Sequence, residues 1–123
     1  MTGSINGSLA EPGSSMYDSM KGAVNMLVKS LAAELASQGI RVNGFAPGMV
    51  LTPYTSWLND KPDDAAWVRL HTPNGKIPGP ESCLGAALLL LSDAADHIHG
   101  HMLFVDGGMA TWQQPYRPAS FKA

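Results

Sequence analysis

Apolar residues recur at steps of three and four across residues 15–38, which predicts one long amphipathic helix. Ser14 or Ser15 can cap its start, and Gly39 follows its last periodic residue, as a left-handed C-cap glycine does. One stripe of this helix carries Met16, Met20, Val24, Leu27, Val28, Leu31, Ala32 and Leu35.

Short apolar segments on both sides of this helix predict strands. Ile40–Ala46 reads as a short buried strand that Pro47-Gly48 stops, and Met102–Val105 as a last strand that Asp106-Gly107-Gly108 closes. Residues 1–4 could form the end of an earlier strand that runs into a loop.

Two further helices are predicted between the strand at Ile40–Ala46 and the last strand at Met102–Val105. A helical turn or two is expected around Asp63–Leu70, entered through two acidic residues, in an otherwise irregular and proline-rich stretch. Glu81–Ser92 is apolar nearly all round, which predicts a buried helix. Helices that alternate with short apolar strands indicate a parallel sheet with right-handed crossovers, and therefore an α/β layered fold.

Composition narrows the class of protein. The 123 residues are 45% hydrophobic and 15% charged, with a net charge of −2, so we expect a globular protein that binds neither nucleic acid nor membrane. The single cysteine, Cys83, cannot form an internal disulfide, and residues 1–4 do not resemble a signal peptide, so a cytoplasmic location is expected. His97, His99 and His101 alternate, but Gly100 interrupts them and no metal site is expected.

Three side chains could perform acid–base chemistry together. Tyr17 and Lys21 are four residues apart at the start of the long helix, so both project to the same side, and an ammonium favours the phenolate form of a nearby phenol. The pair alone fits an ordinary helix surface equally well. Ser4 lies thirteen residues upstream at a predicted strand end, where its hydroxyl could donate to a carbonyl oxygen.

These residues belong to a longer series of motifs. Ser4, Tyr17-x-x-x-Lys21, Ile40-Arg41-Val42-Asn43, Pro47-Gly48-x-Val50-x-Thr52 and Val105-Asp106-Gly107-Gly108 follow one another in order. In order and spacing the series resembles the short-chain dehydrogenase/reductase (SDR) family, and it covers residues 1–108. Arg41 and Asn43 are interpreted as structural residues.

The resemblance implies an NAD(P)-dependent oxidoreductase that transfers a hydride between the cofactor and an alcohol or carbonyl substrate. Tyr17 would be the acid/base, Lys21 would stabilise the phenolate and bind the nicotinamide ribose, and Ser4 would polarise the carbonyl. The nicotinamide end of NAD or NADP would be bound by Pro47, Gly48, Val50 and Thr52, together with Tyr17 and Lys21.

The first half of the family pattern has no counterpart here. A Gly-x-x-x-Gly-x-Gly phosphate loop is absent, and nothing selects NAD over NADP. Residues 1–108 are therefore interpreted as the C-terminal part of a single Rossmann-like three-layer domain, with the last three parallel strands of a doubly wound sheet, and residues 109–123 as a tail.

Two functions remain open at this point. The first is the SDR oxidoreductase. The second is an inactive truncated fragment that acts at most as an association module, since the family dimerises through the helix that corresponds to residues 15–38, and a homo-oligomer is expected. A serine hydrolase is disfavoured because Ser4 lies in no Gly-x-Ser-x-Gly turn.

The loop after Thr52 could contact the substrate. Trp57, Leu58 and Trp67 fall where the family places its substrate lid, although tryptophans that simply pack this loop onto the body explain them equally well. The tail could cover the pocket or reach a neighbouring subunit.

Overall fold

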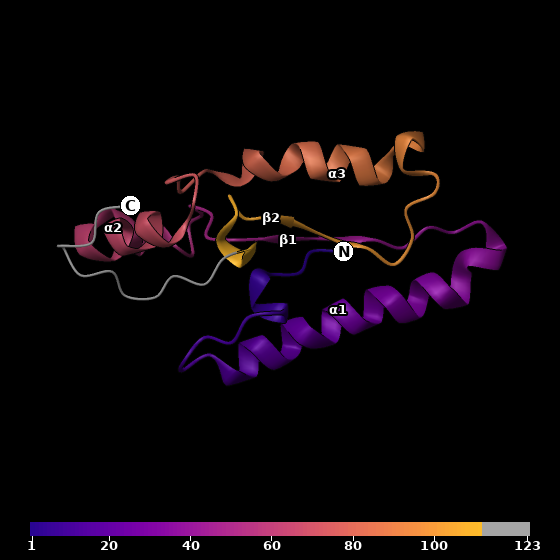
Figure 1. The fold of residues 1–123 in the computed structure, drawn as a ribbon, viewed down its shortest axis with the longest axis horizontal. Coiled ribbons are helices and arrows are strands. Elements are labelled where there is room, and N and C mark those ends of the chain that lie inside the picture. The colour runs from indigo at the N-terminus through magenta and orange to yellow at the C-terminus, as the bar shows by residue number, and fades with distance from the viewer. Residues whose placement is uncertain (112–123) are drawn as a thin grey trace.

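The computed structural model describes residues 1–111, which form a parallel sheet between two helical layers (Figure 1). Helix α1 (Ser15–Leu35) lies on one side of the sheet and α3 (Leu84–Leu91) on the other. Strand β1 (Gly44–Pro47) pairs in parallel with β2 (Met102–Val105). The predicted α/β layered fold is thus confirmed, while most of the predicted tail lies outside the described residues.

The strand predicted before Ser4 is reduced to one bridge. Thr2 pairs in parallel with Phe45, the Gly3 N–H donates to the Phe45 carbonyl at 2.8 Å, and the Phe45 N–H donates to the Met1 carbonyl at 3.0 Å. Ser4 then turns the backbone into a 3-10 helix, Ile5–Gly7. The sheet therefore has two strands and an isolated bridge, and the bridge stands where the end of a third strand was predicted.

Strand β1 starts later than predicted, at Gly44 instead of Ile40. Before it, the Asn43 amide accepts a hydrogen bond from the His101 N–H at 3.0 Å and donates to the Ile98 carbonyl, so it ties two segments together. The Val42 carbonyl accepts from the Gly100 N–H at 2.9 Å, so the backbone already contacts the segment before β2 ahead of the regular strand. The prediction for this segment was therefore right in type and wrong in its first boundary.

Helix α1 forms where the stripe predicted it, but Met16, Met20 and Leu27 of that stripe are exposed. It is continued by a 3-10 turn, Ala36–Gln38, and Gly39 ends it with a φ of 73°, as its position predicted. Val28 and Ala32 are buried towards the sheet. Ser14 is the N-cap residue, but its side chain makes no capping hydrogen bond.

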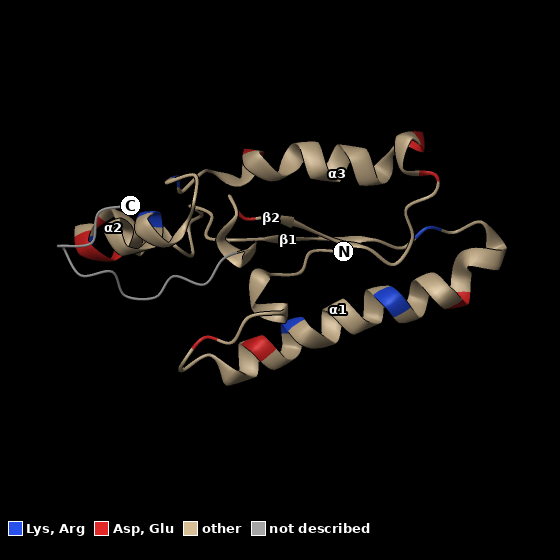
Figure 2. Cartoon of the chain, in the orientation of Figure 1, with Lys and Arg blue, Asp and Glu red and all other residues tan. Residues whose placement is uncertain are grey.

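The prediction that the third helix is buried is wrong. Helix α3 contains no charged residue (Figure 2). Nevertheless Leu88 is 68% exposed and Leu91 is 82% exposed. A helix that is apolar all round is buried only where other elements cover its whole circumference, and the described residues cover one side. None of the helices in residues 1–111 has the length and apolarity needed to span a bilayer.

Helix α2 (Pro62–His71) forms a small lobe with the loop before it, and it confirms the helical turns predicted there. Proline occupies the first helical position, where its missing N–H costs nothing, and two aspartates follow in the first turn. Leu58, Ala65 and Val68 are the buried centre of this lobe, and the partly buried residues packed on them are Met49, Leu51 and Ile77. The lobe lies beyond the end of β1, so it stands beside the predicted site.

Candidate active site

Ser4 lies at the point where the backbone leaves the sheet. It is 8% exposed and is the N-cap of the Ile5–Gly7 helix, and its Oγ accepts a hydrogen bond from the Asn6 N–H at 3.2 Å. Within residues 1–111 the hydroxyl proton of Ser4 is donated to no acceptor. A fixed hydroxyl with its proton available can donate to a substrate oxygen.

Tyr17 and Lys21 lie on one face of the first turns of α1. The Lys21 Nζ is 5.6 Å from the centre of the Tyr17 ring and donates a long hydrogen bond, 3.4 Å, to the Thr2 carbonyl. The ammonium therefore lies over the face of the Tyr17 ring, within the range of a cation–π contact. Tyr17 as a whole residue is 44% exposed.

The segment after β1 brings a glycine against the end of β2. The Gly48 N–H donates to the Val105 carbonyl at 3.2 Å, and a Cβ at Gly48 would lie 2.9 Å from the Asp106 Cβ. The Asp106 carboxylate accepts from the N–H groups of Gly108 and Ala110, which fixes the turn after β2. Glycine is needed at position 48 because these two strand ends pack directly on each other.

Thr52 is positioned by a second threonine. Its Oγ1 lies 3.1 Å from the Thr55 Oγ1, and its N–H donates to that same oxygen at 2.8 Å. The Thr55 hydroxyl in turn donates to the Val50 carbonyl at 2.7 Å. The Val50 N–H, which follows the carboxyl end of β1, donates to no acceptor within the described chain.

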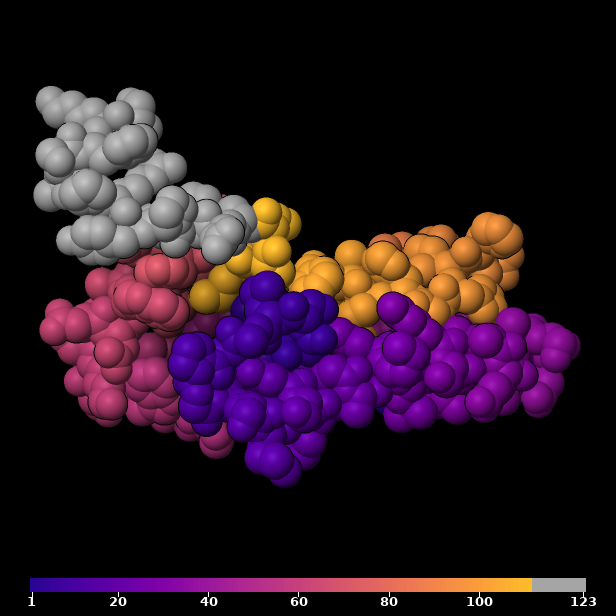
Figure 3. Space-filling model, turned by 60° about the horizontal axis from the view of Figure 1, so that its bottom comes forward, coloured from indigo at the N-terminus to yellow at the C-terminus, as the bar shows by residue number. Residues whose placement is uncertain are grey.

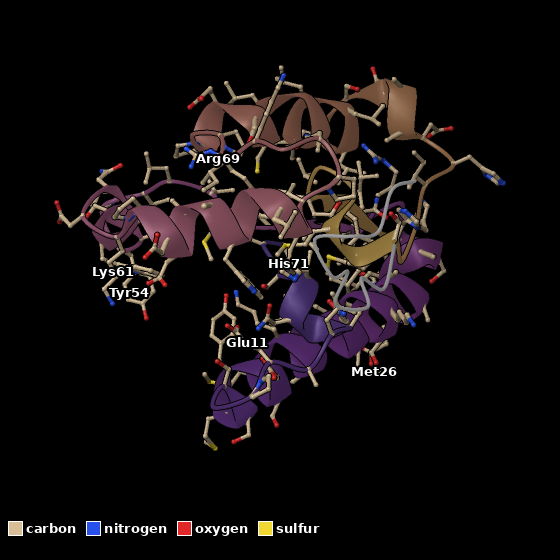
Figure 4. The ribbon with its side chains drawn as sticks, turned by 60° about the vertical axis from the view of Figure 1, so that its left-hand side comes forward. Glu11, Met26, Tyr54, Lys61, Arg69 and His71 are labelled. Carbon is tan, nitrogen blue, oxygen red and sulfur yellow. The ribbon has the colours of Figure 1, made fainter. Side chains whose placement is uncertain are left out.

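The predicted lid residues occupy different environments. Leu58 is buried in the α2 lobe, whereas Trp57 and Trp67 are 41% and 56% exposed. The Lys61 Nζ lies 5.3 Å from the Trp57 ring, and the Trp67 ring stacks on His71 at 4.0 Å. Figure 4 shows Lys61 beside Tyr54 near one end of α2 and His71 near its other end.

Ser4, Tyr17 and Lys21 line neither of two hollows in the described chain. One, of about 600 Å³, is lined by Lys29, His97, His99 and small residues of α1. The other, of about 430 Å³, lies beside the end of β2 and includes Asp106. Among residues 1–111, no group of three His, Cys, Asp or Glu side chains is arranged to hold a metal ion.

Several residues that shape the site were missed by the sequence reasoning. Thr55 fixes Thr52, while Asp18 and Asn25 bind the turn that follows Ser4. The Thr-x-x-Thr spacing is a signal that could have revealed Thr55, because such hydroxyls bond to nearby backbone groups. Nothing in the local sequence pairs Asn25 with a turn 17 or 18 residues away.

Comparison with known proteins is consistent with this geometry. A family model described as enoyl-(acyl carrier protein) reductase, within the SDR family, matches residues 1–110. The protein therefore belongs to the short-chain dehydrogenase/reductase family and carries part of its Rossmann fold.

Individual relatives give the same family. Over 93 residues, 76% of the chain, it is 44% identical to 5-keto-D-gluconate 5-reductase of Escherichia coli (strain K12). A crystal structure of gluconate 5-dehydrogenase from Burkholderia cenocepacia J2315 with NADP and tartrate matches 91% of the chain at 38% identity, with a TM-score of 0.87. A 4-hydroxyisoleucine dehydrogenase complexed with NADH matches 91% of it at 28% identity, with a TM-score of 0.88.

The chain corresponds to less than half of each of these proteins. It spans 37% of the E. coli reductase, 44% of the Burkholderia dehydrogenase chain and 46% of the 4-hydroxyisoleucine dehydrogenase chain.

Proposed function

We propose that this chain carries the proton-transfer half of an NAD(P)-dependent oxidoreductase acting on an alcohol or its carbonyl counterpart. The observation that carries the proposal is the Lys21 ammonium 5.6 Å from the Tyr17 ring on α1. The Ser4 hydroxyl, on the turn that packs against the same helix, supplies the third polar group of the site.

The residues present fit the nicotinamide end of such a cofactor. Within residues 1–111 Lys21 donates one long hydrogen bond, so its ammonium has donors left for ribose hydroxyls. The Val50 N–H is unused within residues 1–111 and can donate to a carboxamide oxygen, and the nearby Thr52 hydroxyl is held by Thr55, which also bonds to the Val50 carbonyl. Gly48 lets the segment that carries Val50 and Thr52 pack directly on the end of β2, where a Cβ would lie 2.9 Å from the Asp106 Cβ.

Ser4, Tyr17 and Lys21 then each have a distinct role in the reaction. When bound, NAD(P) supplies or accepts the hydride. The Ser4 O–H donates to the substrate oxygen and fixes its position, while the Tyr17 phenol gives a proton to that oxygen in reduction and takes one in oxidation. Lys21 stabilises the phenolate left on Tyr17 after the proton has moved.

The substrate class proposed is a polyhydroxylated acid or its keto form. Both the E. coli reductase and the Burkholderia dehydrogenase are named for gluconate derivatives. The lobe beside the site exposes Trp57 and Trp67, and aromatic rings suit the C–H faces of a sugar. The choice between NAD and NADP stays open, since similar structures contain either NADP or NADH.

The direct test uses a ligand matched to the part of the site described. Reduced nicotinamide mononucleotide lacks the adenosine half, so it needs only the nicotinamide-end residues. We expect it to bind with a Kd on the order of 1 mM, about −4 kcal/mol, in a fluorescence titration. Lys21→Ala should weaken binding about tenfold, while Lys29→Ala, a matched lysine farther along α1, should leave it unchanged.

A flat titration up to several times this concentration, or equal losses in both lysine variants, would contradict the proposal. Parallel titrations with NADH and NADPH show whether the second half of the cofactor adds affinity.

We also propose a reducing, cytoplasmic location for the protein, in which Cys83 stays a thiol.

A second candidate function, self-association, is favoured by the exposed face of α1. Met16, Met20 and Leu27 are 75%, 57% and 45% exposed and lie at spacings that place them on one stripe. We propose that this stripe is the contact surface between subunits of a homo-oligomer. Such an oligomer is compatible with the oxidoreductase function proposed above.

We expect the purified chain to elute as an oligomer in size-exclusion chromatography with light scattering. Met20→Glu should shift it towards the monomer because it places a charge within the stripe. Leu88→Glu, the matched change on exposed α3, should leave the oligomer intact. A sharp monomer peak for the unchanged chain, or dissociation by the α3 variant alone, would remove α1 as the interface.

A further inference from the structure

The turn after Ser4 is bound to α1 by the side chains of Asp18 and Asn25. Both lie on the same helix as Tyr17 and Lys21. We propose that Asp18 is a positioning residue for the reaction, which holds Ser4 in place relative to Tyr17 through Asn6, with Asn25 as a second clamp on the same turn. This inference rests on the proposed function and names residues that act on the site without contacting substrate.

The Asp18 carboxylate binds both ends of the segment that follows Ser4. Its Oδ1 accepts from the Asn6 side-chain amide at 2.9 Å, and its Oδ2 accepts from the Glu11 N–H at 2.9 Å. The Asn6 amide also donates to the Glu11 carboxylate at 2.9 Å. Hydrogen bonds to an ionised acceptor are the stronger kind, so this carboxylate anchors the segment.

A continuous chain of bonds leads from Asp18 to the Ser4 hydroxyl. Asn6 is held by Asp18 through its side chain, and its backbone N–H donates to the Ser4 Oγ at 3.2 Å. Asp18 is the residue next to Tyr17 on α1. One rigid connection therefore links the position of the hydroxyl that would orient the substrate to that of the phenol that would exchange its proton.

Asn25 clamps the other end of the turn. Its Nδ2 donates to the Gly7 carbonyl at 3.0 Å and to the Ser8 Oγ at 3.2 Å, which uses both amide protons. Its Oδ1 is buried without a donor among the described residues, so the two acceptors on the turn alone set the orientation of this amide.

The contact between turn and helix is close enough to require glycine. A Cβ at Gly7 would lie 2.7 Å from both the Lys21 carbonyl oxygen and the Asn25 Nδ2. Figure 3 shows the indigo N-terminal segment seated against α1. The turn therefore rests on the backbone of Lys21 itself, between the two clamps.

The test compares Asp18→Ala and the milder Asp18→Asn with Glu34→Ala. Glu34 is an exposed carboxylate of α1 that makes no hydrogen bond or ion pair within residues 1–111. We expect Asp18→Ala to lower kcat for keto-acid reduction about 10–100-fold, since a small misplacement of a reacting group has effects of this size. KM should change less than about threefold, with Asp18→Asn intermediate and Glu34→Ala unchanged.

Amide hydrogen exchange gives a readout that does not need turnover. The Asn6 N–H, the donor to Ser4, should exchange at least about tenfold faster in Asp18→Ala than in Glu34→Ala, while the amides of Val28 and Ala32 in the buried part of α1 keep their rates. Unchanged exchange at Asn6 would overturn the clamp. Faster exchange with unchanged kcat would overturn its role in catalysis.

The same experiment separates this inference from the proposed function. A wild-type chain with no keto-acid reduction counts against the proposed function, and with it against any catalytic role for Asp18. A wild-type chain that reacts, combined with Asp18 variants that change neither kcat nor Asn6 exchange, counts against the positioning inference alone.

Discussion

Tyr17→Phe is expected to lower the rate of keto-acid reduction by about 10²–10⁴-fold, the usual contribution of a positioned acid. The substitution removes the phenol proton and leaves the ring beside Lys21 in place. Binding of reduced nicotinamide mononucleotide should therefore be unchanged, and so should the thermal midpoint. The measurement is the loss of nicotinamide absorbance with 5-keto-D-gluconate as the trial substrate.

Tyr54→Phe is the matched control, because Tyr54 is 90% exposed on the lobe and carries the same hydroxyl. Equal losses in the two variants would show that the phenol of Tyr17 has no special part. An unchanged rate in Tyr17→Phe would assign proton transfer to another group.

Arg41→Met is expected to have the largest effect on stability, lowering the free energy of unfolding by about 2–3 kcal/mol. The guanidinium donates to the carbonyls of Leu90 and Ala95 at 3.1 and 2.9 Å and to that of Ser92 at 3.1 Å. These carbonyls end α3 and the turn after it, where the helix dipole also favours a cation. Methionine keeps the apolar stem and removes every donor.

Urea denaturation followed by circular dichroism measures this loss, at a protein concentration where the oligomeric state of the two proteins is the same. Arg69→Met in the last turn of α2 is the control and should shift stability by less than about 0.5 kcal/mol, as most surface changes do. A loss of similar size in both variants would show that Arg41 acts only as a surface charge.

The parts of the fold predicted correctly were those with a strong local signal. Helix α1 was predicted because its apolar stripe repeats over many turns and Gly39 marks its end, and the structure places both there. The burial of α3 was predicted wrongly because local hydrophobicity says nothing about which other elements cover a helix. Leu88 and Leu91 show that difference directly.

In the candidate site, too, the residues predicted correctly are those with a local sequence signal. The spacing of Tyr17 and Lys21 places them on one helix face by geometry alone, and the structure shows the ammonium close to the ring. The bonds proposed to position Ser4 join residues far apart in the sequence instead: Asp18 binds Asn6, 12 residues away, and Asn25 binds a turn 17 or 18 residues away. Contacts of that kind follow from the packing of the turn on the helix, which no short motif encodes.

The central claim is that Lys21, Val50 and Thr52 form one site for a nicotinamide. Titration of the ¹⁵N-labelled chain with reduced nicotinamide mononucleotide, followed by amide chemical shifts, tests it most directly. The account predicts saturable shifts at the amides of Val50 and Thr52 and in the first turns of α1, with none at His97 or His99. Shifts confined to the hollow beside those histidines, or no saturable shift at all, would contradict it.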